Sequence, residues 1–338
     1  MTEKSAAKKI VWIVILLIAV IGVGIAGFFL ARQMVRDARL KDAEEHRFLS
    51  ATLSAETFVT PLGTPVRLTA SAEGGKGTQY FEFYYMDGDE KVVIRESAPE
   101  NTTTFNAERY GYYTLCVRVS DDTPMTADIS ASCRYGAVHQ GIDVSVYQGN
   151  VQWEKVAAAG YDFAMIRSGF GFAAGQADRN FAQNLTGAVS AGLKVGVYHF
   201  SHATTAEAAK KEAAFCLSII EPYRDKIDYP VVFDIEGDTQ QQLSDEDLIA
   251  VTEAFCSTVA AAGYTPAVYT FDGWLYHHPV WENLQQYPLW VANWTEDPQS
   301  PYAYALWQYS NTGEVDGITG AVDLNYAFYD YENGAVVH

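Results

Sequence analysis

Eight short apolar runs alternate with helical stretches along the second half of this chain, and this alternation restricts the fold more than any other feature. The runs have the length and composition of buried strands, and they are residues 141–145, 163–168, 195–200, 231–236, 267–270, 289–293, 305–309 and 321–324. The clearest helical stretches are residues 181–191, 205–220 and 245–262, with Ser244 as a helix start and Gly192 and Gly263 as helix ends. Such a pattern predicts an α/β fold, a TIM-like β/α barrel. Because the last runs lie close together, we expect an irregular barrel with few helices in its second half.

Two carboxylates, Asp234 and Glu236, end the fourth run. Strand side chains alternate between faces, so both point the same way, with Cα atoms about 6.6 Å apart. Carboxyl pairs at such spacing suit acid-assisted cleavage of a glycosidic bond, in which one group stays protonated while its neighbour stays ionised. Crowding of like charges raises one of the two pKa values and favours that division. The alternatives are a solvated strand end or carboxylates that cap the following helix.

Further polar and aromatic residues belong to the same predicted mouth, because β/α barrels gather their working residues at the C-terminal ends of strands. Asp143 ends the first run and Asp323 lies in the eighth. The candidate substrate-binding residues are Tyr147, Tyr198, His199, Tyr269, Trp290, Asn293, Trp307 and Gln308. Aromatic faces in a cleft suit the flat faces of sugar rings. Taken singly, each has a structural alternative: the two acids as cap residues, Trp290 and Trp307 as core, and His199 as a hydrogen-bonded core histidine.

Residues 10–31 contain no charged side chain and would span about 33 Å as a helix at ~1.5 Å per residue. We therefore expect a transmembrane helix, preceded by a tail of residues 1–9 and followed by a charged, Ala-containing helical stalk over residues 32–49. A cleaved signal peptide is the alternative, but the apolar run is long and no clear cleavage site precedes its polar flank. Basic residues flank both ends almost equally, so they do not set the orientation.

Residues 50–137 consist of short alternating runs separated by turn sequences such as Gly74-Gly75 and Asp121-Asp122. This texture predicts a small all-β sandwich, and it loosely resembles the immunoglobulin-like modules of bacterial surface proteins. A spacer is one interpretation of the module, and glycan or protein binding is the other. Cys116 and Cys133 lie on runs expected to be neighbours, and Cys216 and Cys256 lie on consecutive helices. Two disulfides are thus permitted in an exported protein, with four buried thiols as the alternative.

The charge balance excludes one class of partner. The formal net charge is −19, from 23 basic and 42 acidic residues, and such a field repels nucleic acid. No Cys or His spacing is typical of a zinc site, so we expect neither metal nor cofactor.

A set of motifs follows in order along about residues 139–331. They are Gly141-Ile142-Asp143-Val144-Ser145-x-x-Gln148-Gly149 with Trp153, then Val197-Tyr198-His199-Phe200, Phe233-Asp234-Ile235-Glu236, Pro288-Leu289-Trp290-x-Ala292, Leu306-Trp307-Gln308-Tyr309 and Val322-Asp323-Leu324-Asn325. This ordered set resembles the family 25 glycoside hydrolases, the Chalaropsis-type lysozymes. The resemblance implies a β-1,4-N-acetylmuramidase that acts on peptidoglycan. It also implies a barrel whose last strands carry few helices.

The resemblance assigns roles to four acids by position. Glu236 matches the general acid, and Asp234 would orient or stabilise either the substrate's 2-acetamido group or the oxocarbenium charge. Asp143 and Asp323 match the other acids of the motif set. Tyr147 stands where the family commonly has Trp or His, which affects substrate detail but no catalytic acid. A covalent and a substrate-assisted mechanism both stay open.

Peptidoglycan lies outside the membrane, so the resemblance implies a cytoplasmic amino terminus, with the sandwich and the barrel (residues 138–338) outside the cell. The partners implied are glycan strands, the membrane and, through the β module, a protein. One rival hypothesis is a non-catalytic, anchored wall-binding protein with the same barrel. Others are a glycosidase for chitin-like chains and a phage-type lysin, although an anchor argues against the lysin. The biological role, wall remodelling or local wall penetration, stays open.

Overall fold

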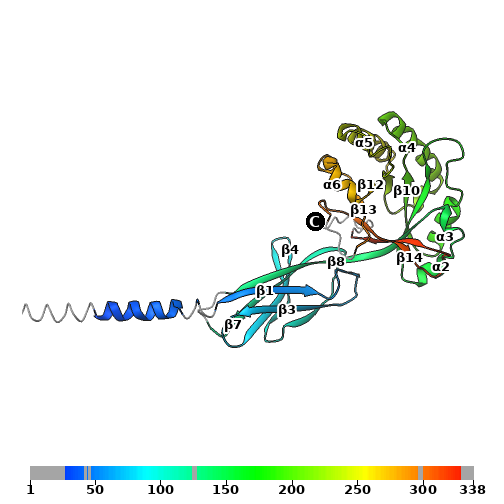
Figure 1. Cartoon of the computed structure of the whole chain (residues 1–338). Helices are drawn as coiled ribbons and strands as arrows, with labels where there is room; N and C mark the ends of the chain where they lie inside the picture. Colours follow the sequence, from blue (N-terminus) through cyan, green and yellow to red (C-terminus); the bar gives the residue numbers. More distant parts are fainter. Residues whose placement is uncertain (1–26, 42–43, 45–46, 124–127, 296–299, 329–338) are drawn as a thin grey trace, which may run out of the picture. The chain divides into compact units, whose positions relative to one another are not determined.

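The computed structural model describes residues 27–41, 44, 47–123, 128–295 and 300–328 (Figure 1). Residues 27–41 are helical and exposed. Residues 1–26, which include most of the predicted membrane helix, lie outside the described residues. Within the described part of the chain, no helix is both long enough and apolar enough to cross a membrane. The anchor stays a prediction.

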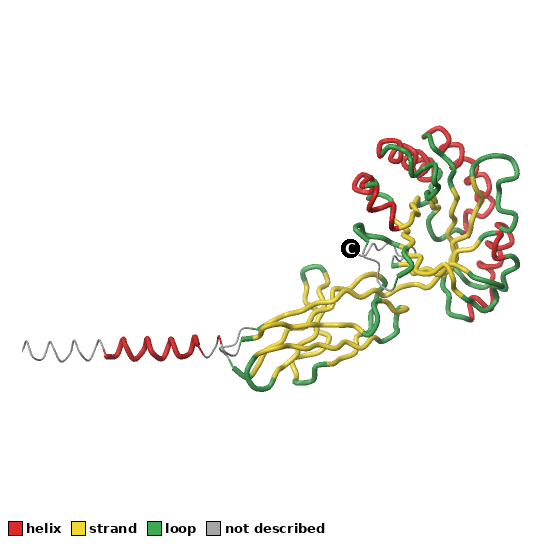
Figure 2. The backbone as a smooth tube through the Cα atoms, viewed as in Figure 1, coloured by secondary structure: helices red, strands yellow, loops and turns green. Residues whose placement is uncertain are grey.

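Residues 48–144 supply strands to two sheets (Figure 2). The strands are β1 (Phe48–Ala55), β2 (Val59–Pro61), β3 (Val66–Gly74), β4 (Gln79–Asp87), β5 (Glu90–Ala98), β6 (Thr102–Phe105), β7 (Gly111–Asp121) and β8 (Ile129–Val144). One sheet has the order β1-β3-β6, and the other runs from β5 through β4 and β7 to β8. Alternate residues of β3 are buried, which is the period expected for a strand with one covered face. The immunoglobulin-like character of this region stays a prediction.

The chain divides into two compact units, and the division cuts across the predicted boundary at residues 137 and 138. One unit contains Met1–Ser54, Leu68–Thr103 and Leu115–Cys133, and the other contains Ala55–Arg67, Thr104–Thr114 and Arg134–His338. Three segments of the predicted β module, residues 55–67, 104–114 and 134–137, therefore belong to the same compact unit as the barrel.

The second unit is built on a closed barrel of eight strands. It starts with the last residues of β8 and continues through β9 (Phe163–Phe170), β10 (Lys194–Phe200), β11 (Val231–Asp234), β12 (Pro266–Phe271), β13 (Leu289–Ala292), β14 (Leu306–Gly313) and β15 (Val322–Ala327). Neighbouring strands from β8 to β14 are parallel. β15 is antiparallel to both β14 and β8, and it closes the ring. The predicted α/β barrel is confirmed, and each of its eight predicted strands is present.

Helices cover the first half of the barrel more fully than the second (Figure 1). They are α2 (Trp153–Ala158), α3 (Phe181–Ser190), α4 (Ala206–Ile220), α5 (Asp245–Ala261) and the short α6 (Asp272–His277), and 3-10 turns are η1 (Val146–Gln148), η2 (Glu221–Lys226) and η3 (Pro279–Asn283). The described residues between β13 and β15 contain no helix. Ser244 caps α5 by accepting a hydrogen bond from the Asp247 backbone N–H, as its position predicts.

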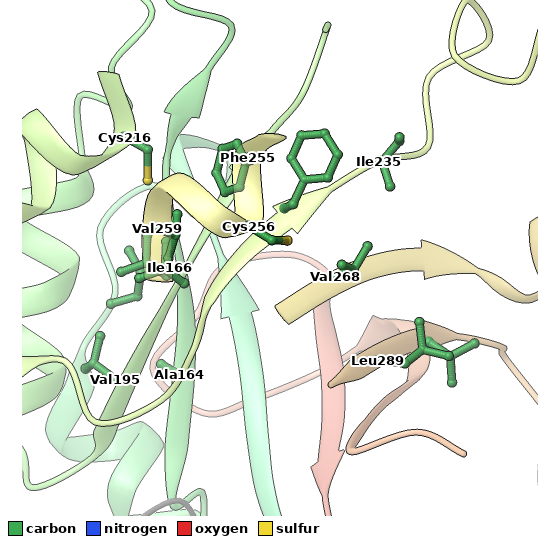
Figure 3. Packing of buried hydrophobic residues seen from close by; sticks show 14 of the residues in the cluster. Ala164, Ile166, Val195, Cys216, Ile235, Phe255, Cys256, Val259, Val268 and Leu289 are labelled. Atoms are coloured by element: carbon green, nitrogen blue, oxygen red, sulfur yellow. The ribbon is translucent and has the colours of Figure 1, made fainter. Parts of the chain in front are cut away.

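Side chains from the two faces of the barrel strands enter different packing layers. The outer layer packs against the helices and includes Ile166, Phe255 and Val268 (Figure 3). The inner layer fills the barrel and includes Phe163, Met165, Tyr229, Trp290 and Leu306. Because these side chains fill one end of the barrel, the other end, where the parallel strands have their C-termini, is left for a site.

Of the two alternatives left open for the cysteines, disulfides and buried thiols, the second describes Cys216 and Cys256. Cys216 on α4 and Cys256 on α5 are both buried in the outer layer, where their sulfur atoms lie apart (Figure 3). Cys216 Sγ lies 3.4 Å from Ser168 Oγ. Packing therefore accounts for these two buried thiols.

Candidate active site

A cavity of about 460 Å³ opens at the C-terminal ends of the parallel barrel strands. Its walls are Asp143, Ser145, Tyr147, Gln148, Arg167, Phe170, Tyr198, Phe200, His202, Asp234, Glu236, Tyr269, Trp290, Gln308 and Asp323. All four predicted acids are among them. A polar cavity with several acids and aromatic walls is typical of a carbohydrate site.

Asp143, at the end of β8, is the most firmly held of the four acids. Its Oδ2 accepts hydrogen bonds from Gln308 Nε2 at 2.9 Å and from Asn325 Nδ2 at 2.8 Å. Trp290 Nε1 in turn donates to Asn325 Oδ1 at 2.9 Å. Burial, with the charge of Asp323, raises the pKa of Asp143 well above its usual range.

Asp323 reaches the cavity because its strand runs in the opposite direction. It is the second residue of β15, and its Cα is paired with that of Asp143 across the β15–β8 ladder. In a parallel strand that position would lie at the closed end of the barrel. Burial raises the pKa of Asp323.

Asp234 and Glu236 line the same cavity, as the alternation predicts, although β11 ends at Asp234. The extended path continues because Ile235 N–H donates to the Tyr269 carbonyl at 3.0 Å. Burial raises both pKa values, and the charged neighbours then differ: Glu236 and Asp143 raise that of Asp234 further, whereas Asp323 raises that of Glu236. The neighbouring Tyr269 hydroxyl lowers the pKa of Glu236. The environment of Asp234 and Glu236 therefore favours the protonated form of a carboxyl group.

The aromatic walls are of two kinds. Trp290 is buried, with its ring 4.7 Å from that of Tyr269 and 6.0 Å from that of Tyr198. Tyr147 follows the end of β8 in the turn η1 and is 81% exposed. An exposed ring at a cavity mouth is free to stack on a sugar.

Three predicted binding residues do not line the cavity: His199, Asn293 and Trp307. His199 and Trp307 belong to the outer face because their neighbours Tyr198 and Gln308 point inward. His199 is fully buried, with Nδ1 2.8 Å from Ser168 Oγ and Nε2 2.8 Å from the Gly171 carbonyl. Strand alternation assigns both residues to the packing layer, which is the core alternative given for them from the sequence.

Asn293 supports the mouth from outside the cavity. Its Nδ2 donates to Asp272 Oδ2 at 2.6 Å, and its backbone carbonyl accepts from Trp307 Nε1 at 2.7 Å. The adjacent Trp294 is 57% exposed, and its Nε1 donates to Gln308 Oε1 at 3.2 Å. Asn293 thus fixes the loop that presents Trp294 beside the acid-bound Gln308.

Arg167 on β9 and its partner Asp178 were not predicted from the sequence. Arg167 lines the cavity, and its Nε and Nη2 both lie 2.9 Å from Asp178 Oδ2. The signal was present: Met165 points into the barrel, so Arg167, two residues later in the same strand, does so as well.

Arg167 lies within an otherwise apolar run, residues 163–168, and a charge in such a buried run requires a partner.

No group of three or more His, Cys, Asp or Glu in the described residues is arranged to hold a metal ion.

Comparisons with known proteins agree on one family. The model of glycosyl hydrolases family 25 matches residues 142–318, more than half of the chain. Lysozyme M1 of Streptomyces globisporus is 32% identical over 197 residues, which are 55% of this chain and 66% of that protein. The N,O-diacetylmuramidase of Arthroderma benhamiae is 28% identical over 211 residues, 56% of this chain and 86% of that protein.

A solved structure of a glycosyl hydrolase 25 from Streptococcus pneumoniae shares the fold, with a TM-score of 0.50 and 17% identity over 58% of this chain and 90% of that one. Lysozymes and a muramidase are thus among the relatives. The chain belongs to glycosyl hydrolases family 25, a family of lysozyme-type glycoside hydrolases.

Proposed function

We propose that this chain is a membrane-anchored muramidase, which hydrolyses the β-1,4 bond between N-acetylmuramic acid and N-acetylglucosamine in peptidoglycan. The observation that carries the proposal is the pair Asp234 and Glu236 at the end of β11, inside an aromatic-walled cavity with two further acids. Lysozyme M1 and the diacetylmuramidase support the substrate class by family.

Glu236 is the general acid of the proposed reaction. Its proton passes to the glycosidic oxygen as the bond to the anomeric carbon breaks. Asp234, two residues away, stabilises the positive charge that develops on the sugar or on its 2-acetamido group. Water then adds its hydroxyl group to the anomeric carbon, and the remaining proton returns to Glu236. Burial and the charge of Asp323 raise the pKa of Glu236 and so favour the protonated starting state.

The substrate contacts that we propose come from the walls of the same cavity. Tyr147 and Trp290 provide aromatic faces, Tyr198 and Tyr269 hydroxyl groups, and Gln308 an amide. Asp143 and Asp323 shape the electrostatic field around the scissile bond. The Tyr269 hydroxyl donates to Gln308 Oε1 at 3.3 Å, which links this wall to the Asp143 carboxyl.

The location belongs to the same proposal. The uncharged stretch of residues 10–31 would anchor the enzyme, with residues 1–9 in the cytoplasm and the barrel outside the cell. An immunoglobulin-like module over residues 50–137 would hold the barrel away from the membrane or bind a protein. A tethered enzyme fits local wall remodelling or wall penetration.

Protease treatment of intact cells tests the orientation. The protease should degrade the barrel, and a protected barrel would contradict the proposed orientation.

Digestion of purified peptidoglycan tests the activity. The full chain in detergent should release fragments that end in reduced N-acetylmuramic acid after borohydride treatment, as seen by mass spectrometry. Glu236→Gln should release at least 10²-fold fewer, the usual scale for loss of a general acid, with an unchanged circular dichroism spectrum. Glu154→Gln, at an exposed position of α2, is the matched control and should keep full activity. A folded wild-type protein that sediments with the wall but releases nothing would instead be an anchored binding protein.

A further inference from the structure

Glu236 lies two residues beyond the end of β11, so the strand itself does not fix the backbone on both sides of this acid. On the side of the strand, the Ile235 N–H donates to the Tyr269 carbonyl at 3.0 Å. On the other side, the Gly237 N–H donates to a side-chain atom, Oε1 of Gln240, at 3.0 Å. The N–H groups before and after the proposed general acid are therefore both bonded, and the second bond depends on Gln240.

Gln240 is fully buried and uses both ends of its carboxamide group. Besides the bond to Oε1, its Nε2 donates to the Ala203 carbonyl at 3.0 Å and to Ser201 Oγ at 3.1 Å. The Gly237 N–H can only donate and the Ala203 carbonyl can only accept, so these partners fix which end of the amide is the oxygen. An apolar side chain of the same length would leave these partners without the bonds that Gln240 makes.

The nitrogen end of this amide reaches the loop that follows β10. Ser201 Oγ also donates to Glu212 Oε2 at 2.6 Å and accepts the Ala203 N–H at 3.0 Å. Glu212 is buried on α4, and its Oε1 accepts the His202 N–H at 2.9 Å. The loop of residues 201–203 is thus attached to α4 by a buried carboxyl group. It is a firm anchor for the amide, and through the amide for the segment of the acid.

The position of Glu236 matters because a general acid works only within hydrogen-bond reach of the oxygen that it protonates. A displacement of about 1 Å at the reacting group can slow the chemical step by ~10²-fold. The residues that follow Gly237, Asp238 and Thr239, are exposed in a turn. The bond from Gly237 to Gln240 therefore separates the acid from an exposed turn and joins it to the interior of the barrel.

We propose that Gln240 is a positioning residue of the reaction, which holds Glu236 in place by anchoring the next peptide group to the buried loop of residues 201–203. Gln240 acts through the Gly237 backbone and does not line the cavity. The inference rests on the proposed catalytic role of Glu236. Its direct test, however, requires no turnover.

Hydrogen exchange of the full chain in detergent, followed by mass spectrometry, measures the restraint. Gln240→Met keeps the length of the side chain and removes the amide. In this variant, peptides that contain the Gly237 N–H should exchange about fivefold faster or more, the scale of one lost hydrogen bond. Gln241→Met makes the same replacement at the exposed neighbouring position and should leave the exchange unchanged. Unchanged exchange in folded Gln240→Met would overturn the proposal.

Turnover of soluble peptidoglycan fragments separates positioning from substrate binding. In folded Gln240→Met, kcat should fall by about tenfold to 10²-fold with a smaller change in KM, because a misplaced acid slows the chemical step. Gln241→Met should keep the kcat of the wild type. An unchanged kcat in Gln240→Met, whether or not KM rises, would overturn the proposal.

Gln240→Glu tests whether the amide acts through its hydrogen bonds. When protonated, its carboxyl group offers an acceptor and a donor as the amide does, and when ionised it offers acceptors only. Its kcat is divided by that of the wild type at each pH, which removes the titrations of Glu236, Glu212 and His202 that both proteins share. This ratio should be highest in acid and fall as the pH rises, whereas the ratio for Gln240→Met should stay low throughout.

If Gln240→Met does not fold, Gln240→Glu decides alone, and a ratio that does not change with pH would overturn the proposal. A wild-type protein without activity would refute the proposed function. The exchange rates would then still decide whether Gln240 holds the segment of Glu236.

Discussion

Neighbouring residues of one strand can have opposite roles, and Tyr198 and His199 of β10 show this. Tyr198 faces the cavity, whereas His199 packs with its ring 6.1 Å from that of Phe255. The Gly171 carbonyl can only accept, so Nε2 of His199 carries the hydrogen and Nδ1 is left to accept from Ser168. Burial lowers the pKa of His199 to about 4, so the ring is neutral at physiological pH.

This histidine should make the fold sensitive to acid. Its pKa in the folded protein, about 4, is lower than the ordinary histidine value of 6.5. The contribution of the neutral ring to the free energy of unfolding is therefore fully present above pH 6.5. It is lost as the pH falls to 4, and the loss is about 3 kcal/mol, at 1.36 kcal/mol for each unit of pKa difference. Urea unfolding of His199→Gln should show a stability deficit at pH 7 that shrinks by about this amount at pH 4. The exposed His277→Gln is the control. A deficit that does not change with pH would contradict a neutral buried ring.

Close packing inside the barrel depends on a residue without a side chain. A Cβ added to Gly141 of β8 would lie 2.3 Å from Cζ of Phe163, whose ring stacks on that of Tyr229 at 4.7 Å. Gly141→Ala should therefore cost about 1–3 kcal/mol of unfolding free energy, as overpacked cores do. The smaller side chain of Phe163→Leu should relieve much of that cost. Thermal unfolding of the two single variants and the double variant measures the coupling, and equal losses in both backgrounds would show that the glycine has another purpose.

The strands of the barrel could be predicted from sequence because each is a short apolar run bounded by turns and helices. The predicted run 163–168 became β9 (Phe163–Phe170), and 289–293 became β13 (Leu289–Ala292). Alternation along the run 231–236 was enough to place Asp234 and Glu236 on the same side. The same rule, applied to His199 and Trp307, would have placed them outside the cavity.

Two further features could not be read from the apolar pattern. The reversed direction of β15 depends on long-range pairing, so the position of Asp323 at the start of its strand was not evident. The thiols of Cys216 and Cys256 depend on the side-chain geometry of two packed helices, which sequence separation does not determine.

The compact unit that contains the barrel is larger than its family match. Phe58 and Tyr112, from segments before residue 138, pack near Trp307 and Phe328: the Phe58 and Trp307 rings are 6.2 Å apart, and Tyr112 stacks on Phe328 at 4.2 Å. The Arg134 guanidinium carbon lies 3.7 Å from the centre of the Tyr112 ring. These aromatic contacts cover the outer face of strands that carry no helix.

A fragment that begins at residue 138 should therefore be less stable than one that begins at residue 48. Removing the segments 55–67 and 104–114 would expose Trp307 and Phe328, and exposed aromatic patches promote association. Each lost large side-chain contact costs on the order of 1–3 kcal/mol. Differential scanning calorimetry measures the melting temperatures of the two fragments, and light scattering measures their association. Equal melting temperatures with a monomeric short fragment would show that the barrel is self-sufficient.

β8 gives the molecule a property that concerns force rather than chemistry. It carries the chain into the barrel, where its last residues are hydrogen-bonded to β9 on one side and to β15 on the other. In the anchored enzyme that we propose, tension from the amino-terminal side would pull β8 along its own axis. All of its ladder bonds would then be loaded in shear at once, whereas a terminal hairpin would open one bond at a time. Single-molecule pulling from residue 48 should show the barrel yielding in one high-force step, so the active cavity would keep its shape while the wall and the membrane move apart.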